Sequence, residues 1–379
     1  MTATVPDKVR ALAPMTVLTK EVGGKNSHAN GCEPAGADLD RLTSLVRGPV
    51  FGPGDPGLAA ELATHNLTYP IRPAVTVGAL DAADVSAAVR WAADHGRRVA
   101  VHATGHGSVG PVDGAVLIVT ELDFDLLPVG RLYGGGLFYP GEHAAAVLHR
   151  YREWVATLSE RTTTSIALLR LPPLPTIPEP LRRRFVVQLR VAHLGHAGEG
   201  VPMLAPMRRV APPIIDGVSE IPYAAVDSIH GDPTDPVPSF DRGTALAQLP
   251  AAAVDAMLAV AGPGVDVPLI VVELRHLGGA LARPAAVPNA VAGRDAAFSL
   301  LALGPMAGPL VDVVPAVTKS VIDAVAPWST GGALLNFLGP ADEQRVRSLW
   351  GTADRHRLAG VKSAVDPTNV FSFGSAMGV

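Results

Sequence analysis

A glycine-rich loop offers the first chemistry in this sequence. Gly105, Gly107 and Gly110 have the spacing G-x-G-x-x-G, which is typical of dinucleotide-binding loops. That fingerprint requires a helix directly after the loop. Here Pro111 and the turn Asp113–Gly114 intervene, and another β-like run follows. The spacing therefore does not predict a Rossmann domain.

The same loop can bind an anion, because glycines let main-chain N–H groups approach a phosphate closely. His106 lies between Gly105 and Gly107, so we expect its imidazole at the loop surface rather than in a core. From the loop alone two interpretations stay open, a phosphate-binding loop or a tight surface turn with a solvated histidine.

The elements before the loop are expected to be a strand, a helix and a second strand. The first strand begins at Arg72, and Asp81 can cap the helix that follows. Apolar residues repeat at helical spacing on one face of this helix, at Val85, Ala88, Val89 and Ala92. Gly96 ends the helix, and the next strand leads into Thr104–Gly107.

This order of elements resembles the FAD-binding domain of the vanillyl-alcohol-oxidase (PCMH-type) flavoproteins, and most of all their berberine-bridge-enzyme-like branch. At the other end of the chain, Asp366–Phe371 (DPTNVF) is similar to the C-terminal signature of that branch, Asp-Pro-x-Asn-x-Phe. The resemblance implies an α+β fold, with a PCMH-type FAD-binding domain and an antiparallel-sheet substrate domain that carries helices on one face.

The resemblance also implies a domain organisation. We expect an irregular N-terminal extension, an FAD-binding domain, a substrate-binding domain and a segment that returns to the FAD domain, at residues 1–37, 38–128, 129–338 and 339–379 respectively. Val119–Gly130 is similar to the last strand of the FAD domain, yet it directly follows Ala115–Ile118. Most of the second flavin-binding lobe is thus missing, through an internal deletion or because this sequence omits it.

FAD is the cofactor that the resemblance implies. His106 matches the histidine that bonds covalently to the flavin ring in this branch. The amides of Gly105, Gly107 and Ser108 would face the pyrophosphate, and Thr104 opens the loop.

Two further cofactor-binding positions, Asn369 and Phe371, come from the C-terminal signature. The branch has a second covalent anchor, a cysteine in the second lobe. The single cysteine of this chain, Cys32, precedes the first lobe and does not match it, and one cysteine allows no intramolecular disulfide.

An oxidation of this kind needs a group that takes a proton from the substrate while hydride leaves for the flavin. The branch often places a tyrosine before the C-terminal lysine, Lys362, but that position holds Arg355, which stays protonated. We expect Tyr133 or Tyr139, near the domain junction, to act in its place. The alternative is that both are strand residues half in the core.

Glu273 and Arg275 share one face of the strand predicted at Leu269–His276, because strand side chains alternate. In the related enzymes this sheet lines the substrate pocket. Glu273 is therefore a third catalytic candidate, and Arg275, His276 and Asn336, the last on a strand predicted at Ser329–Leu338, are substrate-binding candidates. The alternative for Glu273 and Arg275 is a solvated ion pair.

Other polar clusters predict no metal site. His193 and His196 have no third ligand at metal-binding spacing. Asp227, His230 and Asp232 lie in one proline-flanked loop, but their spacing is generic.

Composition excludes several classes of partner. The net charge of −4 offers no basic surface for nucleic acid or an anionic membrane. No apolar run reaches the roughly 20 residues that span a bilayer. The N-terminal region is a poor secretory signal, so we expect a cytoplasmic protein. Abundant arginine and alanine are typical of a GC-rich bacterial genome.

Together these features predict an FAD-dependent oxidoreductase that oxidises an alcohol, amine or C–H bond of a small organic molecule, with O2 as the final acceptor. The alternative is a flavin-free ligand-binding protein, or a non-redox cyclase, on a truncated oxidase scaffold. Loss of a lobe would expose apolar surface and so favour a homodimer.

Overall fold

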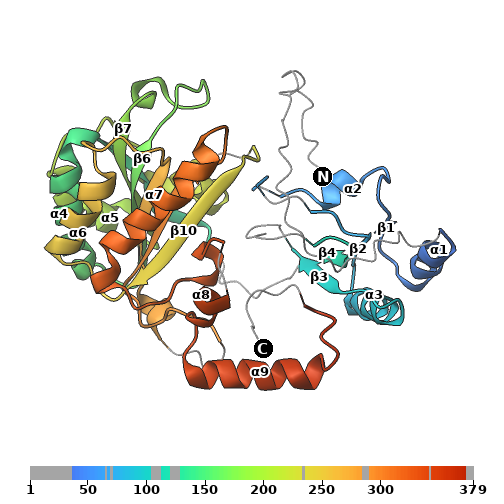
Figure 1. Cartoon of the computed structure of the whole chain (residues 1–379). Helices are drawn as coiled ribbons and strands as arrows, with labels where there is room; N and C mark the ends of the chain where they lie inside the picture. Colours follow the sequence, from blue (N-terminus) through green and yellow to red (C-terminus); the bar gives the residue numbers. More distant parts are fainter. Residues whose placement is uncertain are drawn as a thin grey trace. The chain divides into compact units, whose positions relative to one another are not determined.

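The structure is a computed structural model, and it describes residues 36–64, 66–68, 71–103, 112–119, 129–232, 235–283, 290–340 and 343–372. Within these ranges no helix is both long and apolar enough to cross a bilayer. The described chain forms a small sheet before residue 120 and a large sheet after residue 130 (Figure 1).

The small sheet is mainly parallel. Its strands are β1 (Val50–Phe51), β2 (Val75–Gly78), β3 (Val99–His102) and β4 (Val116–Val119), in the order β1-β2-β4-β3. β2 and β3 both run parallel to β4, so that Gly78 and His102 align with Val119. The carboxyl ends of three strands therefore meet at one edge, where open α/β sheets bind ligands.

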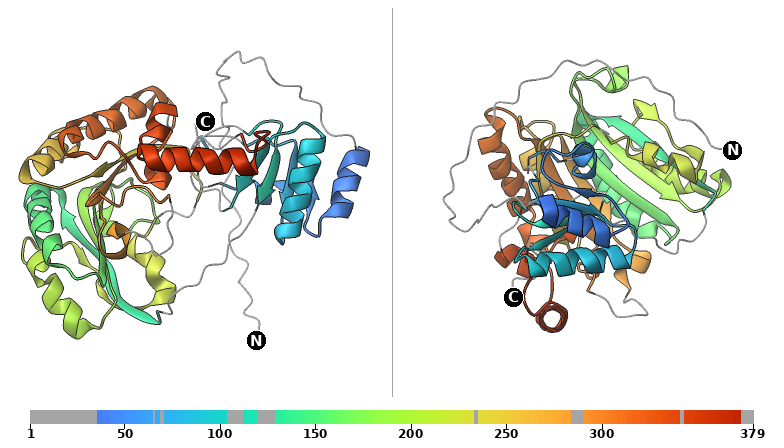
Figure 2. Two further views of the ribbon diagram at one scale, coloured as in Figure 1. Left: turned by 90° about the horizontal axis from the view of Figure 1, so that it is seen from below. Right: turned by 90° about the vertical axis from the view of Figure 1, so that its right-hand side faces the viewer.

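Two helices, α1 (Gly36–Leu45) and α3 (Ala82–Asp94), lie side by side next to this sheet (Figure 2, blue and cyan), and α2 (Leu58–Glu61) is a single turn. The predicted ends of α3 are confirmed. The Asp81 side chain accepts hydrogen bonds from the amides of Ala83 and Asp84. Gly96 adopts a φ of +60° after the last turn, a conformation that glycine tolerates best.

The large sheet is antiparallel throughout. Its strand order is β10-β12-β11-β6-β7-β5-β8, and β9 pairs with β5. The bounds are β5 (Arg131–Pro140), β6 (Thr162–Arg170), β7 (Phe185–His193), β8 (Ile215–Asp216), β9 (Ser219–Pro222), β10 (Ser239–Leu246), β11 (Val271–His276) and β12 (Phe298–Pro305).

Four helices cover one face of the large sheet (Figure 1). They are α4 (Ala144–Trp154), α5 (Ala197–Arg208), α6 (Ala251–Ala261) and α7 (Leu310–Ala324). Alternate strand residues such as Leu189, Leu274 and Leu300 point into this layer and are fully buried. The expected sheet with helices on one face is thus confirmed, and it leaves the opposite face for other contacts.

Short 3-10 helices and a C-terminal helical segment complete the described chain. The 3-10 helices are η1 (Gly141–His143), η2 (Val155–Thr157), η3 (Glu179–Leu181), η4 (Tyr223–Ile229), η5 (Gly279–Ala282), η6 (Ala326–Trp328) and η7 (Leu335–Phe337). The C-terminal helices are α8 (Glu343–Arg347) and α9 (Thr352–Val365).

The strand predicted at Ser329–Leu338 is wrong for most of its length. Only its beginning lies along β10, where Thr330 donates to the carbonyl of Ala245 at 2.9 Å. Gly331 then takes a φ of +83°, which breaks the extended backbone, and the chain turns into η7. Asn336 consequently lies in a 3-10 turn rather than on a strand.

Candidate active site

Charged side chains gather on the face of the large sheet opposite the four helices. Arg190 in β7 is aligned with Ser165 in β6, which in turn is aligned with Arg275 in β11, so all three point to the same side. Glu273 precedes Arg275 by two residues and shares this side. We call Gln188, Arg190, Glu273 and Arg275 the polar network.

The polar network centres on the Glu273 carboxylate. Arg190 donates to one carboxylate oxygen at 2.7 Å, and Arg275 donates to the other at 3.0 Å. The Arg190 and Glu273 side chains are only 5% and 2% exposed. Burial alone would raise the Glu273 pKa, but the two guanidinium charges outweigh it and hold that pKa below its usual value.

Further contacts fix both ends of the network. Arg190 donates to the Gln188 amide oxygen at 3.0 Å, and Gln188 donates to the main-chain carbonyl of Ile229 at 3.2 Å. The Arg275 guanidinium lies 4.5 Å from the ring centroid of Phe337 in η7. Its side chain is 33% exposed, so Arg275 can contact a ligand.

Burying such charges costs desolvation free energy, and apolar residues of similar size would often stabilise the fold equally well. The other end of the same face is apolar: Ala167, Leu169 and Val186 pack there with Leu181 from η3. The charged side chains of the polar network therefore lie directly next to an apolar cluster on the same face of the sheet.

His230 and Asp232 lie at the edge of the network. Asp232 Oδ1 is 3.8 Å from Arg190, and Asp232 Oδ2 is 3.7 Å from His230 Nδ1. The spacing of these residues is generic, and only the fold brings them to Arg190. The sequence did contain a signal for the polar network. In the run Phe185–Ala192, Gln188 and Arg190 are polar residues on one side of a strand whose other residues are apolar.

Tyr133 and Tyr139 lie on the helix-covered face, away from the network. Tyr139 is fully buried and donates to the main-chain carbonyl of Met207 at 3.0 Å. Tyr133 is 2% exposed and accepts a 3.0 Å hydrogen bond from Arg208, which also pairs with Asp216. These contacts favour the alternative interpretation, that both are strand residues in the core, and the expected catalytic role stays a prediction.

The remaining predicted residues of this sheet fall in different places. Both carboxylate oxygens of Glu273 are occupied by arginines, which suits a positioning residue and not a base. His276 points to the helix-covered side, where its ring lies 5.4 Å from that of Phe298. Asn336 is exposed in η7, next to the Phe337 that contacts Arg275.

The C-terminal signature folds around one carboxylate. Asp366 accepts hydrogen bonds from the amides of Val370 and Phe371 at 2.8 and 3.0 Å and pairs with Lys362. Val370 in turn accepts a 2.7 Å hydrogen bond from the amide of Val99 in β3. Asn369 takes a φ of +54° in this tight turn. The signature therefore joins the small sheet beside β3.

The residues around this turn suit a bound cofactor. Ser372 has a buried hydroxyl without a hydrogen-bond partner among the described residues, and Phe371 packs partly against the small-sheet core. His102 ends β3 at the sheet edge formed by the parallel strands. Thr104, Gly105, His106, Gly107 and Ser108 lie outside the described residues, as does Cys32.

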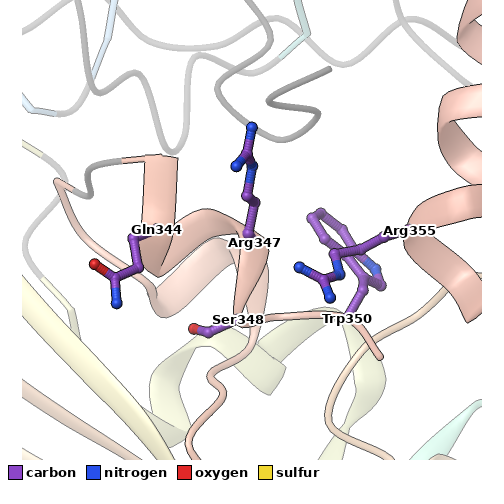
Figure 3. Close-up of a pocket in the computed structure, with 5 residues that line it drawn as sticks. All are labelled: Gln344, Arg347, Ser348, Trp350 and Arg355. Atoms are coloured by element: carbon purple, nitrogen blue, oxygen red, sulfur yellow. The ribbon is translucent and has the colours of Figure 1, made fainter. Parts of the chain in front are cut away.

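A pocket of about 380 Å³ lies between α8 and α9 (Figure 3). It is lined by Gln344, Arg347, Ser348, Trp350 and Arg355. Arg355, which stands where a tyrosine was expected, donates to the Thr352 hydroxyl at 3.1 Å. This pocket is basic, and Arg355 cannot accept a proton there.

His193 and His196 have structural partners. His193 Nδ1 lies 2.9 Å from the Thr162 hydroxyl and its Nε2 lies 3.3 Å from Glu199. His196 caps α5 by accepting from the amide of Gly198. Among the described residues there is no group of three or more His, Cys, Asp or Glu side chains that could hold a metal.

Comparisons with known proteins agree with this architecture. The profile of the family "Berberine and berberine like" matches residues 333–376, which include α8, α9 and the Asp366 turn. No curated protein matches the chain in sequence.

Solved structures match over nearly their whole length. 6-Hydroxy-D-nicotine oxidase from Arthrobacter nicotinovorans superposes with a TM-score of 0.70 at 17% identity, covering 87% of this chain and 97% of that one. Xylooligosaccharide oxidase from Myceliophthora thermophila, in complex with xylobiose, gives 0.71 at 12%, covering 90% and 99%. Glucooligosaccharide oxidase from Acremonium strictum gives 0.68 at 11%, covering 88% and 96%.

The chain has the fold of the PCMH-type FAD-binding oxidases. The expected fold is thereby confirmed, and the berberine-like C-terminal segment lies where the resemblance placed it in the sequence. The described residues before the large sheet form only one small sheet, and 11 residues separate β4 from β5. The predicted domain boundaries remain predictions.

Proposed function

We propose that this protein is an FAD-dependent oxidoreductase that oxidises a small organic alcohol or amine, with O2 reoxidising the cofactor. The observation that carries the proposal is the polar network, a buried Arg–Glu–Arg cluster on the helix-free face of a sheet in an oxidase fold. FAD, when bound, accepts hydride from the substrate carbon.

We place FAD at the edge of the small sheet formed by the carboxyl ends of β2, β3 and β4. The loop after β3 would hold the pyrophosphate through the amides of Gly105, Gly107 and Ser108, with Thr104 at its start and His106 as covalent anchor. Asn369 and Phe371 would contact the cofactor from the C-terminal turn. The unpartnered Ser372 hydroxyl supports this position, since a cofactor would supply its missing partner.

The polar network has the substrate-binding role in this proposal. Arg275 is the member exposed enough to donate hydrogen bonds to a substrate oxygen, and Asn336 lies beside its Phe337 contact. Glu273 and Arg190 keep Arg275 in place through charge-assisted hydrogen bonds. Among similar folds, one oxidase is named for 6-hydroxy-D-nicotine and another was solved with xylobiose. An amine or a sugar alcohol is therefore the first substrate class to test.

Visible absorption of the purified protein, before and after acid precipitation, tests the cofactor. A yellow protein with a yellow pellet is expected, and His106→Ala should give a colourless pellet while the supernatant turns yellow. Cys32→Ser is the matched control and should keep the yellow pellet. A soluble, monodisperse protein that stays colourless after incubation with FAD would contradict the proposal and favour the flavin-free alternative.

A further inference from the structure

We propose that His230, with the Asp232 carboxylate close to its Nδ1, accepts the proton of the substrate's O–H or N–H group. This inference rests on the oxidoreductase function proposed above. The proton would pass to Nε2 of His230. FAD, when bound, would take the hydrogen on the adjacent carbon as hydride, with its two electrons, so that the bond from this carbon to oxygen or nitrogen would become double. The imidazolium then loses its proton to solvent.

The fold brings His230 to the polar network through η4. Gln188 anchors the end of η4 by its 3.2 Å hydrogen bond to the Ile229 carbonyl. Gly134 of β5 leaves room for this approach, since a Cβ there would lie 3.1 Å from a side-chain atom of Ile229. His230 follows directly and is placed at the rim of the network.

Asp232 lies near the imidazole. Its Oδ2 is 3.7 Å from Nδ1, which is beyond hydrogen-bond distance but close enough for attraction between charges, and no described residue forms a hydrogen bond with Nε2. The side chains of His230 and Asp232 are 33% and 67% exposed, so a ligand can reach the pair. A carboxylate behind an imidazole also stabilises the imidazolium that forms during proton transfer.

Four charged groups face His230. Arg190 comes from β7, Glu273 and Arg275 come from β11, and Asp232 comes from its own loop. Burial, Arg190 and Arg275 lower the His230 pKa, and Glu273 and Asp232 raise it, with a net lowering. His230 is therefore neutral near pH 7, the state that a base requires.

The other candidate bases are already engaged. Glu273 has both oxygens paired with arginines, and Tyr133 and Tyr139 lie under the helices. Arg355 is permanently protonated. Within the described residues of this face, His230 is the titratable group that combines exposure, a neutral state and an available nitrogen.

Two measurements test the proposal on the yellow holoenzyme. In the first, anaerobic flavin bleaching is followed against pH with 6-hydroxy-D-nicotine, xylobiose and benzyl alcohol as probes, and the fastest probe is kept. In the second, NMR of ¹⁵N-histidine-labelled protein follows the His230 imidazole without substrate. The variants are His230→Gln and Asp232→Asn. His149→Gln is the matched control, because His149 lies 3.0 Å from Asp255 on the helix layer.

His230→Gln should slow bleaching about 10²- to 10⁴-fold and abolish the acid limb of its pH profile, while His149→Gln leaves both unchanged. Asp232→Asn removes a charge that raises the His230 pKa, so the acid limb and the NMR titration should both move to lower pH. Bleaching by His230→Gln at the wild-type rate, or a titration that Asp232→Asn does not move, would overturn the inference. A wild type that no probe bleaches would overturn the proposed function itself.

Discussion

The guanidinium of Arg190 donates a 2.7 Å hydrogen bond to the carboxylate of Glu273 across 83 residues of sequence. Two strands that are not neighbours in the sheet supply the pair, since β6 lies between β7 and β11. Both side chains are almost completely buried, and their ion pair links β7 to β11 across β6.

Glu273→Gln should destabilise the protein by about 3–5 kcal/mol, because it leaves Arg190 buried without its nearest counter-charge. Urea denaturation measures the loss. The double variant Arg190→Met, Glu273→Leu should recover most of this stability, since an apolar pair suits a buried site. It should nevertheless fail to bind substrate, because Arg275 loses its partner. Equal destabilisation in the single and double variants would argue against this account.

Gly243→Ala should displace η7. A Cβ at Gly243 would lie 2.1 Å from the Phe337 carbonyl oxygen, far inside van der Waals contact. We expect a stability loss of about 1–3 kcal/mol from overpacking, together with a raised KM, because Phe337 supports Arg275. Gly264→Ala is the control, since no atom lies within 4 Å of a Cβ there. If the KM of Gly243→Ala is unchanged, Phe337 does not contribute to substrate binding.

Asp366→Asn should loosen the C-terminal turn and cost about 1–3 kcal/mol at pH 7. Burial raises the Asp366 pKa. Lys362 and the amides of Phe371 and Val370 lower this pKa by more than burial raises it, so the pKa in the folded state is below the usual value. A carboxyl group whose pKa is lower in the folded than in the unfolded protein stabilises the fold at pH values above its unfolded-state pKa. This stabilisation is lost as the pH falls through the folded-state pKa. The gap between wild type and variant, measured by thermal unfolding, should therefore shrink below about pH 4.

Asp81→Ala should destabilise α3 by about 0.5–2 kcal/mol, because the side chain caps the amides of Ala83 and Asp84. The ion pair with Arg47 adds little, since the Arg47 side chain is 77% exposed. Arg47→Leu, which removes that pair but keeps the cap, should stay within about 0.5 kcal/mol of wild type in chemical denaturation. A larger loss of stability in Arg47→Leu would show that the ion pair contributes more than predicted.

Local sequence signals predicted the local structure well. The Asp81 cap and the Gly96 end of α3 depend on residues within a few positions of each other, so they can be read without the fold. The strand predicted at Ser329–Leu338 failed for a local reason too, because Gly331 adopts a left-handed backbone that the apolar run after it obscured.

The sequence by itself determined the α+β class, the alternation that puts Glu273 and Arg275 on one face, and the C-terminal Asp366–Phe371 turn. Only the tertiary structure decided which face of the large sheet is covered, and it thereby sent Tyr133, Tyr139 and His276 to the helix side. It also decided that Arg190 pairs with Glu273 and that Asp232 lies near both Arg190 and His230. The reason is physical: side-chain alternation is a property of one strand, whereas partners on strands distant in sequence are chosen by sheet register and by the packing of helices on one side.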